Sequence, residues 1–149
     1  MTITAPPADS RAIGLAHYAA RAVLERALTR HAITFPQQIT LRYAVFADGP
    51  LAPDALVAQV TGALKTDPGD VRATIGELRG RGLLSADGPL IGPTEAGREL
   101  IATVTAETSE ATARIWAGIP AEDLAAAGRV LALVTERADA ELAAPTSPR

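Results

Sequence analysis

Apolar residues recur along most of the chain at alternating spacings of three and four, which is the period of a helix with one buried face. The first such segment covers residues 11–30, and Asp9 and Ser10 stand where they can cap the first turn. Thr34 and Pro36 then supply a hydroxyl cap and an early proline for a second helix over 37–47. The first third of the chain is therefore predicted to form two helices.

The middle of the chain has the pattern of a helix-turn-helix. A third helix begins at Pro53. Asp67 and Pro68 mark the start of a fourth helix, because aspartate caps helices and proline fits the first turn. The fourth helix ends at Gly82, and its buried face is expected to consist of Val71, Ile75 and Leu78.

A short hairpin and two long helices complete the pattern. Short apolar runs on either side of the turn Ala86-Asp87-Gly88-Pro89 predict a β-hairpin over 83–92, which we call the wing. Long helices follow over 95–118, capped by Thr94, and over 121–143. The last helix has apolar residues with a seven-residue rhythm, namely Leu124, Ala127, Leu131, Val134 and Ala138.

The predicted fold is mainly α, a winged helix-turn-helix flanked by long N- and C-terminal helices. We expect a flexible N-terminus over 1–9, a winged helix-turn-helix over 35–94, a helical dimerisation region formed by 10–34 and 95–144, and a flexible tail over 145–149. The long outer helices need apolar cover, which a second copy in a two-fold homodimer or an intramolecular bundle would supply. The dimer is the favoured interpretation.

Composition narrows the possible functions. Hydrophobic residues make up 48% of the 149 residues but aromatic residues only 3%, as suits closely packed helices. The absence of cysteine excludes disulfides, thiolate metal sites and thiol chemistry. The net charge is −3, from 14 basic and 17 acidic residues, which argues against a non-specific nucleic-acid coat. We see no signal peptide or membrane span and expect a cytoplasmic protein.

Enzymatic and metal-binding functions find little support. The chain has no Gly-x-Ser-x-Gly motif and no glycine-rich phosphate loop after a strand. His17 and His31 stand fourteen positions apart and define no zinc site. Glu107 and Glu110 share a helix face that we expect to be solvated. We therefore expect neither an enzyme nor a bound cofactor.

The sequence resembles the MarR family of bacterial transcriptional regulators over about residues 10–144. Four stretches are similar: 31–37 at a helix junction, 51–84 around the fourth helix, the run Pro-Thr-Glu-Ala-Gly-Arg over 93–98, and the last helix over 121–143. The resemblance implies a dimeric DNA-binding regulator, which we expect to be a repressor that binds an inverted-repeat operator. The wing tip differs from the family pattern because it has no Arg or Lys, so minor-groove contact by the wing does not follow from the resemblance.

In such a protein the fourth helix would enter the major groove. Arg72 is the candidate for bidentate recognition of a guanine, and Lys65, Thr66, Arg79 and Arg81 are candidates for phosphate contact. The other outward positions are Gly69, Asp70, Ala73 and Gly76. Residues 51–98 contain five bases and six acids, so DNA binding should be weak or use few phosphate contacts. The alternative is a protein-interaction module or an anti-regulator with weak or no DNA binding.

The resemblance also implies a small aromatic or phenolic effector, bound between the dimer helices and the DNA-binding lobe. Polar and aromatic side chains in suitable elements are the candidates for this site: His17, Tyr18, Arg21, His31, Phe35 and Tyr43. The alternative is that these side chains are ordinary packing residues. Trp116 is expected to be a dimer anchor.

Overall fold

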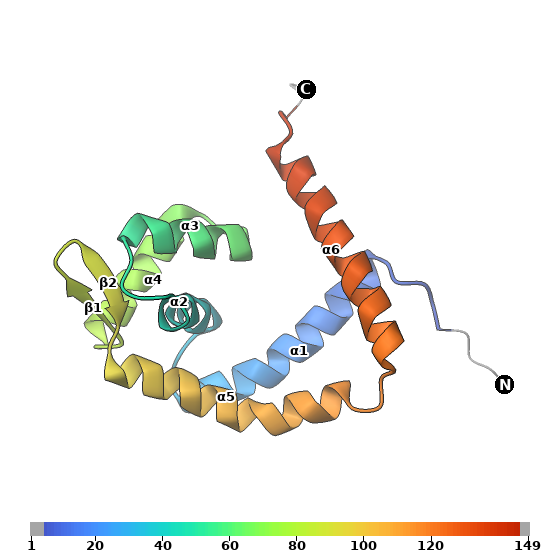
Figure 1. Ribbon diagram of the computed structural model, residues 1–149, viewed down its shortest axis with the longest axis horizontal. Helices are drawn as coiled ribbons and strands as arrows, with labels where there is room; N and C mark the ends of the chain where they lie inside the picture. The colour runs from blue at the N-terminus through green and yellow to red at the C-terminus, as the bar shows by residue number, and fades with distance from the viewer. Residues whose placement is uncertain (1–4, 147–149) are drawn as a thin grey trace. The chain divides into compact units, whose positions relative to one another are not determined.

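The computed structural model describes residues 5–146, which form six helices and one β-hairpin (Figure 1). In chain order these are α1 Ser10–Arg30, α2 Phe35–Val45, α3 Pro53–Leu64, α4 Pro68–Gly80, β1 Leu84–Asp87, β2 Leu90–Pro93, α5 Glu95–Trp116 and α6 Ala121–Ala143. This order confirms the predicted winged helix-turn-helix with long outer helices. The described residues divide into two units, 5–111 and 112–146, which we describe separately.

Side-chain caps explain where α1 and α2 begin. The Asp9 carboxylate accepts a hydrogen bond from the Ala12 amide at 2.8 Å, as predicted. The second helix begins at Phe35, two residues earlier than predicted. The reason is a capping box: the Thr34 hydroxyl accepts from the Gln37 amide, and the Gln37 side chain accepts from the Thr34 amide.

The core of the first unit lies where α2 packs against α3, α4 and β2. Leu41, Leu56 and Leu78, one from each of the three helices, are completely buried. The predicted inner face of α4 is confirmed, because Val71, Ile75 and Leu78 are all buried. β1 and β2 pair antiparallel in the predicted hairpin, and Leu51 forms a bridge to Ile91 that joins the start of the α3 segment to the wing.

Thr94 and Gly97 hold the start of α5 against the segment that leaves α4. The Thr94 hydroxyl donates to the Gly82 carbonyl at 2.6 Å and accepts from the Gly97 amide at 3.1 Å. A side chain at Gly97 would overlap the Leu83 carbonyl and press on the Leu41 side chain. Glycine at this position is therefore required by a close approach of backbones.

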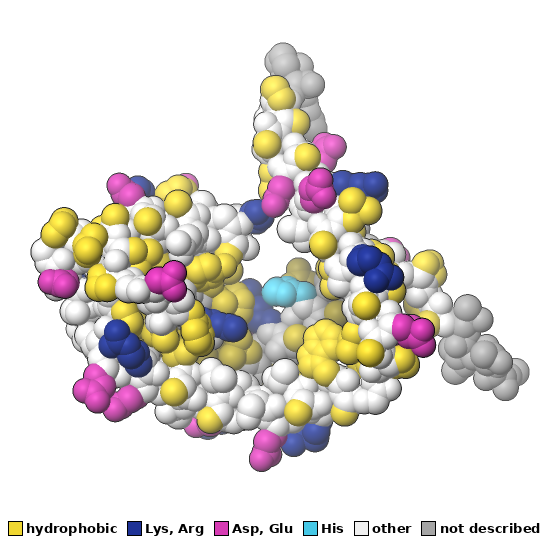
Figure 2. Space-filling model, in the orientation of Figure 1, with side chains coloured by type: hydrophobic (Ala, Val, Ile, Leu, Met, Phe, Trp, Pro, Cys, Tyr) yellow, Lys and Arg dark blue, Asp and Glu magenta, His cyan; other side chains and the backbone are white. Residues whose placement is uncertain are grey.

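The second unit comprises the end of α5 from Thr112 and the whole of α6. None of the residues of α6 is buried, and Leu131 and Val134 are 46% and 43% exposed. The space-filling view shows hydrophobic side chains along α6 beside acidic and basic ones (Figure 2). A helix of this composition gains most of its stability from packing its apolar face, so α6 needs a partner surface.

The two ends of the chain that were predicted to be flexible contain no helix or strand among their described residues. Residues 5–9, 145 and 146 have no regular secondary structure, and 1–4 and 147–149 lie outside the described residues. Between residues 5 and 146, none of the helices combines the length and apolarity that a membrane crossing requires.

Candidate nucleic-acid interface

The helix α4 has one face in the core and one face in solvent. Opposite the buried residues lie five exposed ones, which are the outward positions expected from the sequence: Gly69, Asp70, Arg72, Ala73 and Gly76. Short side chains and a single guanidinium make this face narrow enough to approach a groove closely. The structure thus places these predicted site residues together.

The structure gives a reason for glycine at position 69 of this face but not at position 76. The Gly69 amide donates to the capping carboxylate of Asp67 at 2.7 Å, and a Cβ at Gly69 would lie only 2.9 Å from that oxygen. A Cβ at Gly76 would meet nothing within 4 Å. Glycine inside a helix costs about 1 kcal/mol relative to alanine. Packing within the subunit gives no reason for that cost at Gly76.

Arg72 contacts the preceding helix of the helix-turn-helix. Its Nη2 atom lies 3.4 Å from Oδ1 of Asp54, which is in the first turn of α3. Both side chains are exposed, with 58% of Arg72 and 87% of Asp54 accessible. Asp54 was not among the residues expected at this site, because its separation of eighteen positions from Arg72 gives no local pattern.

Lys65 sits at the turn between α3 and α4 in a left-handed backbone conformation, with φ of 53°. This conformation is unfavourable for residues other than glycine but is common where a helix ends, as α3 does here. Thr66 follows it and is half-buried, whereas Arg79 is exposed near the end of α4. The predicted phosphate-contacting residues Lys65, Thr66 and Arg79 are therefore spread along the exposed side of the helix-turn-helix.

Arg81 has partners within the fold that the sequence did not indicate. Its guanidinium donates to the carbonyls of Ala32 and His31 at 2.8 and 3.4 Å, and to Oε1 of Gln37 at 3.4 Å. Gln37 in turn donates to Glu77 at 2.7 Å. The end of α4 is thus tied to the bend between α1 and α2. The spacing of Thr34 and Gln37, which is that of a capping box, is the sequence signal that could have drawn attention to Gln37.

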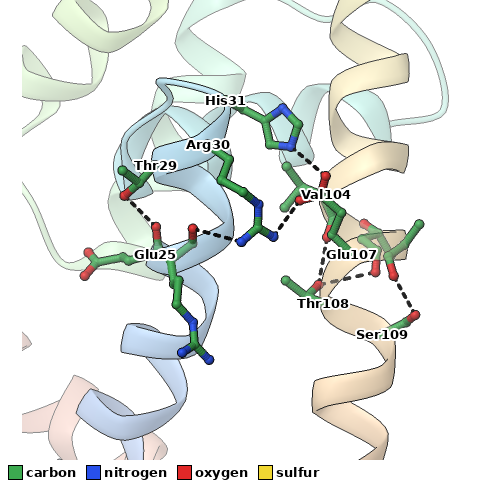
Figure 3. A network of polar contacts seen from close by, with 11 residues as sticks. Glu25, Thr29, Arg30, His31, Val104, Glu107, Thr108 and Ser109 are labelled. Atoms are coloured by element: carbon green, nitrogen blue, oxygen red, sulfur yellow. Dashed lines mark hydrogen bonds and ion pairs between the residues drawn. The ribbon is translucent and has the colours of Figure 1, made fainter.

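Glu107 of α5 also contacts this bend, through Arg30 and His31 (Figure 3). Its two carboxylate oxygens accept from Arg30 at 2.9 Å and from His31 at 3.1 Å. The hydrogen bonds from Arg30 and then His31 hold the pKa of Glu107 below its ordinary value of 4.5. Glu107 is exposed, as expected, but it also forms hydrogen bonds with Arg30 and His31 that the sequence did not reveal. Over residues 5–146, no three histidine or carboxylate side chains gather closely enough to hold a metal ion.

The six candidate effector residues do not form one cluster. His17 and Tyr18 meet edge to face on an exposed part of α1, with ring centroids 5.6 Å apart. The Arg21 guanidinium stacks 4.2 Å above the centre of the Phe35 ring. His31 contacts Glu107, as described above. Tyr43 lies apart from these contacts and lines a groove.

That groove is open, has a volume of about 930 Å³ and lies between the end of α2, the following loop and α3. Its aromatic lining is Tyr43 and Phe46, of which Phe46 is 68% exposed. The Arg42 guanidinium lies 5.7 Å from the centre of the Phe46 ring. The remaining lining residues are Ile39, Ala47, Asp48, Gly49, Pro50, Leu51 and Gln59. No motif in the sequence marks Arg42 or Phe46 as groove residues, because the groove is assembled only when the chain folds.

Solved structures share this architecture over most of the chain. A MarR-family transcriptional regulator from Rhodococcus sp. RHA1 matches with a TM-score of 0.68 and 22% identity, over 87% of this chain and 98% of that one. CouR from Rhodococcus jostii RHA1, bound to p-coumaroyl-CoA, matches with a TM-score of 0.68 and 21% identity, over 83% and 88%. BpsR from Bordetella bronchiseptica, whose DNA binding is regulated by 6-hydroxynicotinic acid, matches with a TM-score of 0.62 and 21% identity, over 88% and 98%.

Comparison with models of known families found no match, and comparison with curated protein sequences found none either. The structural likeness is therefore one of fold, at identities below 25%. It agrees with the element order of a winged helix-turn-helix between long outer helices. The protein has the winged-helix fold of the MarR-type transcriptional regulators.

Proposed function

We propose that this protein is a dimeric, sequence-specific DNA-binding transcriptional regulator that acts as a repressor. The observation that carries the proposal is the exposed face of α4, where Arg72 stands among small residues. A helix in the major groove needs such a face, with a donor that can pair with guanine and short neighbours that allow close approach. Residues 35–94 would form the DNA-binding region.

The dimer would form through residues 10–34 and 95–144. The apolar side chains exposed along α6 support this assignment, because they have no cover among the residues of their own unit. A two-fold dimer would present two copies of α4 to an inverted-repeat operator and would double the phosphate contacts. The doubled number of phosphate contacts would matter because the winged region has slightly more acidic than basic residues, so a single copy should bind DNA weakly.

A small aromatic effector would relieve repression by binding at the groove beside α2. Tyr43 and Phe46 supply aromatic surface and Arg42 supplies a cation, which together suit an aromatic acid. Two proteins of the same fold, CouR and BpsR, are described with an aromatic thioester and an aromatic acid, which supports this chemistry. His17, Tyr18, Arg21, His31 and Phe35 do not line this groove, so a contribution from them would belong to a separate effector site between the dimer helices and the DNA-binding lobe.

The test is a titration of the purified protein against the DNA upstream of its own gene, at about 50 and about 200 mM salt. A regulator gives discrete complexes on an inverted repeat that weaken steeply with salt. Arg72→Ala should abolish sequence preference while leaving the fold intact, whereas the control Arg98→Ala removes the same charge from α5 and should retain the preference. An aromatic acid that raises the melting temperature should also release the DNA, and Phe46→Ala should weaken both effects.

The same experiment distinguishes a second function. A winged helix that serves as a protein-interaction module or an anti-regulator would give no discrete complex at either salt concentration. Such a module would bind a protein partner instead. The near balance of bases and acids over 51–98 is the observation that keeps this alternative open.

A further inference from the structure

We propose that Asp54 positions the Arg72 guanidinium for base recognition and is therefore a specificity-determining residue of α3. The inference rests on the proposed function of α4 as the recognition helix. It assigns a role to a carboxylate that would otherwise only oppose DNA binding. Asp54 is a positioning residue in this proposal, since it acts through Arg72 and does not itself contact a base.

The contact joins the two helices of the helix-turn-helix on their exposed side. Oδ1 of Asp54 lies 3.4 Å from Nη2 of Arg72, and the two residues stand eighteen positions apart in the chain. Both side chains are more than half exposed, so the pair adds little to the stability of the fold. The effect of the pair is instead to favour one position of the guanidinium at the end of the flexible Arg72 side chain.

The chemistry of the guanidinium makes this placement useful. A guanidinium has five N–H donors in a rigid plane, and bidentate recognition of guanine uses two of them. A carboxylate at Nη2 engages one part of the fork and leaves donors for the O6 and N7 atoms of the base. Holding Arg72 in place before binding also reduces the rotamer entropy that recognition would otherwise have to overcome.

Asp54 has a second electrostatic consequence, of opposite sign. An exposed carboxylate beside the recognition helix repels the phosphates of any DNA. Removing its charge should therefore raise affinity for all DNA sequences while it lowers discrimination among them. A variant of Asp54 that binds all DNA more tightly but distinguishes sequences less well is therefore the result expected of a residue that positions Arg72.

A purely local role of Asp54 predicts a different result. Asp54 is in the first turn of α3, where the N-cap residue Ala52 makes no side-chain cap, so its charge also complements the positive end of the helix. Loss of that interaction would lower the melting temperature slightly. It would not change which base pairs are preferred.

The experiment uses the full chain and the duplex that the wild-type protein enriches from a random-sequence library. Affinities for this duplex and for each single-base-pair variant are measured for wild type, Asp54→Asn, Arg72→Ala and the double variant. Asp87→Asn is the control, because it removes one exposed carboxylate from the wing tip, away from Arg72. Melting temperatures show that every variant is folded.

We expect Asp54→Asn to reduce discrimination at one base pair of each half-site by about threefold to tenfold, a part of what a bidentate contact supplies. The reduction should vanish when Arg72 is already alanine. Asp87→Asn should raise affinity uniformly and leave discrimination unchanged. The inference is overturned if Asp54→Asn behaves like this control or has no effect. If the wild-type protein enriches no sequence, the proposed function itself fails, which is a separate outcome.

Discussion

The backbone carbonyl of Leu83 occupies the space that a side chain on Gly97 would need. Because the obstacle is backbone, Gly97→Ala forces the start of α5 away from the wing. We expect a loss of about 2 kcal/mol or more in the free energy of unfolding, measured by denaturant titration. The control is Gly62→Ala in α3, where a Cβ meets nothing within 4 Å and the helix should become more stable. Equal effects at the two positions would contradict the close approach.

Gly76→Ala should separate stability from DNA binding. A Cβ fits there without contact, so the variant should be up to about 1 kcal/mol more stable than wild type. If α4 lies deep in the groove, the added methyl group should weaken specific binding in a fluorescence-anisotropy titration. Gly62→Ala gains the same helix propensity and should bind DNA as wild type does. A Gly76→Ala protein with unchanged affinity would show that this face stays away from DNA.

Lys65→Gly should likewise stabilise the fold and weaken DNA binding. Glycine relieves the left-handed backbone strain at φ of 53°, which we expect to contribute up to about 1 kcal/mol. Loss of the ammonium should reduce the slope of log affinity against log salt by about one per subunit. Ala32→Gly is the matched control, since Ala32 has a φ of 50° and carries no charge. An unchanged salt slope in Lys65→Gly would remove Lys65 from the interface.

Most of the fold could be predicted because its signals are local. Caps such as Asp9 and Asp67, prolines in first turns and the apolar period of each helix depend only on neighbours in the chain. The start of α2 was misplaced by two residues because Pro36 was taken as preceding the helix, whereas it lies within the first turn.

The candidate site was predictable only in part, for the same physical reason. The outward face of α4 follows from helical period, so its members could be named from sequence. The contacts of Arg81 with Ala32, and of Glu107 with Arg30, join residues 49 and 77 positions apart and depend on the finished fold. The groove around Phe46 is lined by residues of the continuous stretch 39–51 and by Gln59 of α3, so its shape depends on how the chain turns back between α2 and α3.

Glu107→Gln should change how stability depends on pH. The pKa of Glu107 is lowered in the folded protein, so its ion pairs stabilise the fold above the unfolded pKa near 4.5. That contribution is lost as the pH falls through the lower, folded pKa. Melting temperatures of wild type and Glu107→Gln should therefore differ at pH 7 and converge only when the pH falls below the folded pKa of Glu107, which lies under 4.5. A difference that is constant with pH would mean that the ion pairs do not contribute.

Acidic substitutions on the apolar face of α6 should disrupt the proposed dimer. Leu131→Glu combined with Val134→Glu places two charges where apolar cover is needed. Sedimentation velocity should then show a monomer with weaker operator binding. Ala140→Glu adds a charge on the opposite side of the same helix and should leave the dimer intact. A wild-type monomer in solution would overturn the proposed assembly.

The guanidinium of Arg81 bonds two successive carbonyls at the bend between α1 and α2, while Glu107 holds the side chains of the residues just before and at that bend. A displacement of the bend would therefore either break these hydrogen bonds or carry the C-terminal end of α4 with it. We expect a change in α1 or α5 that moves the bend to alter the position of that end of α4 as well.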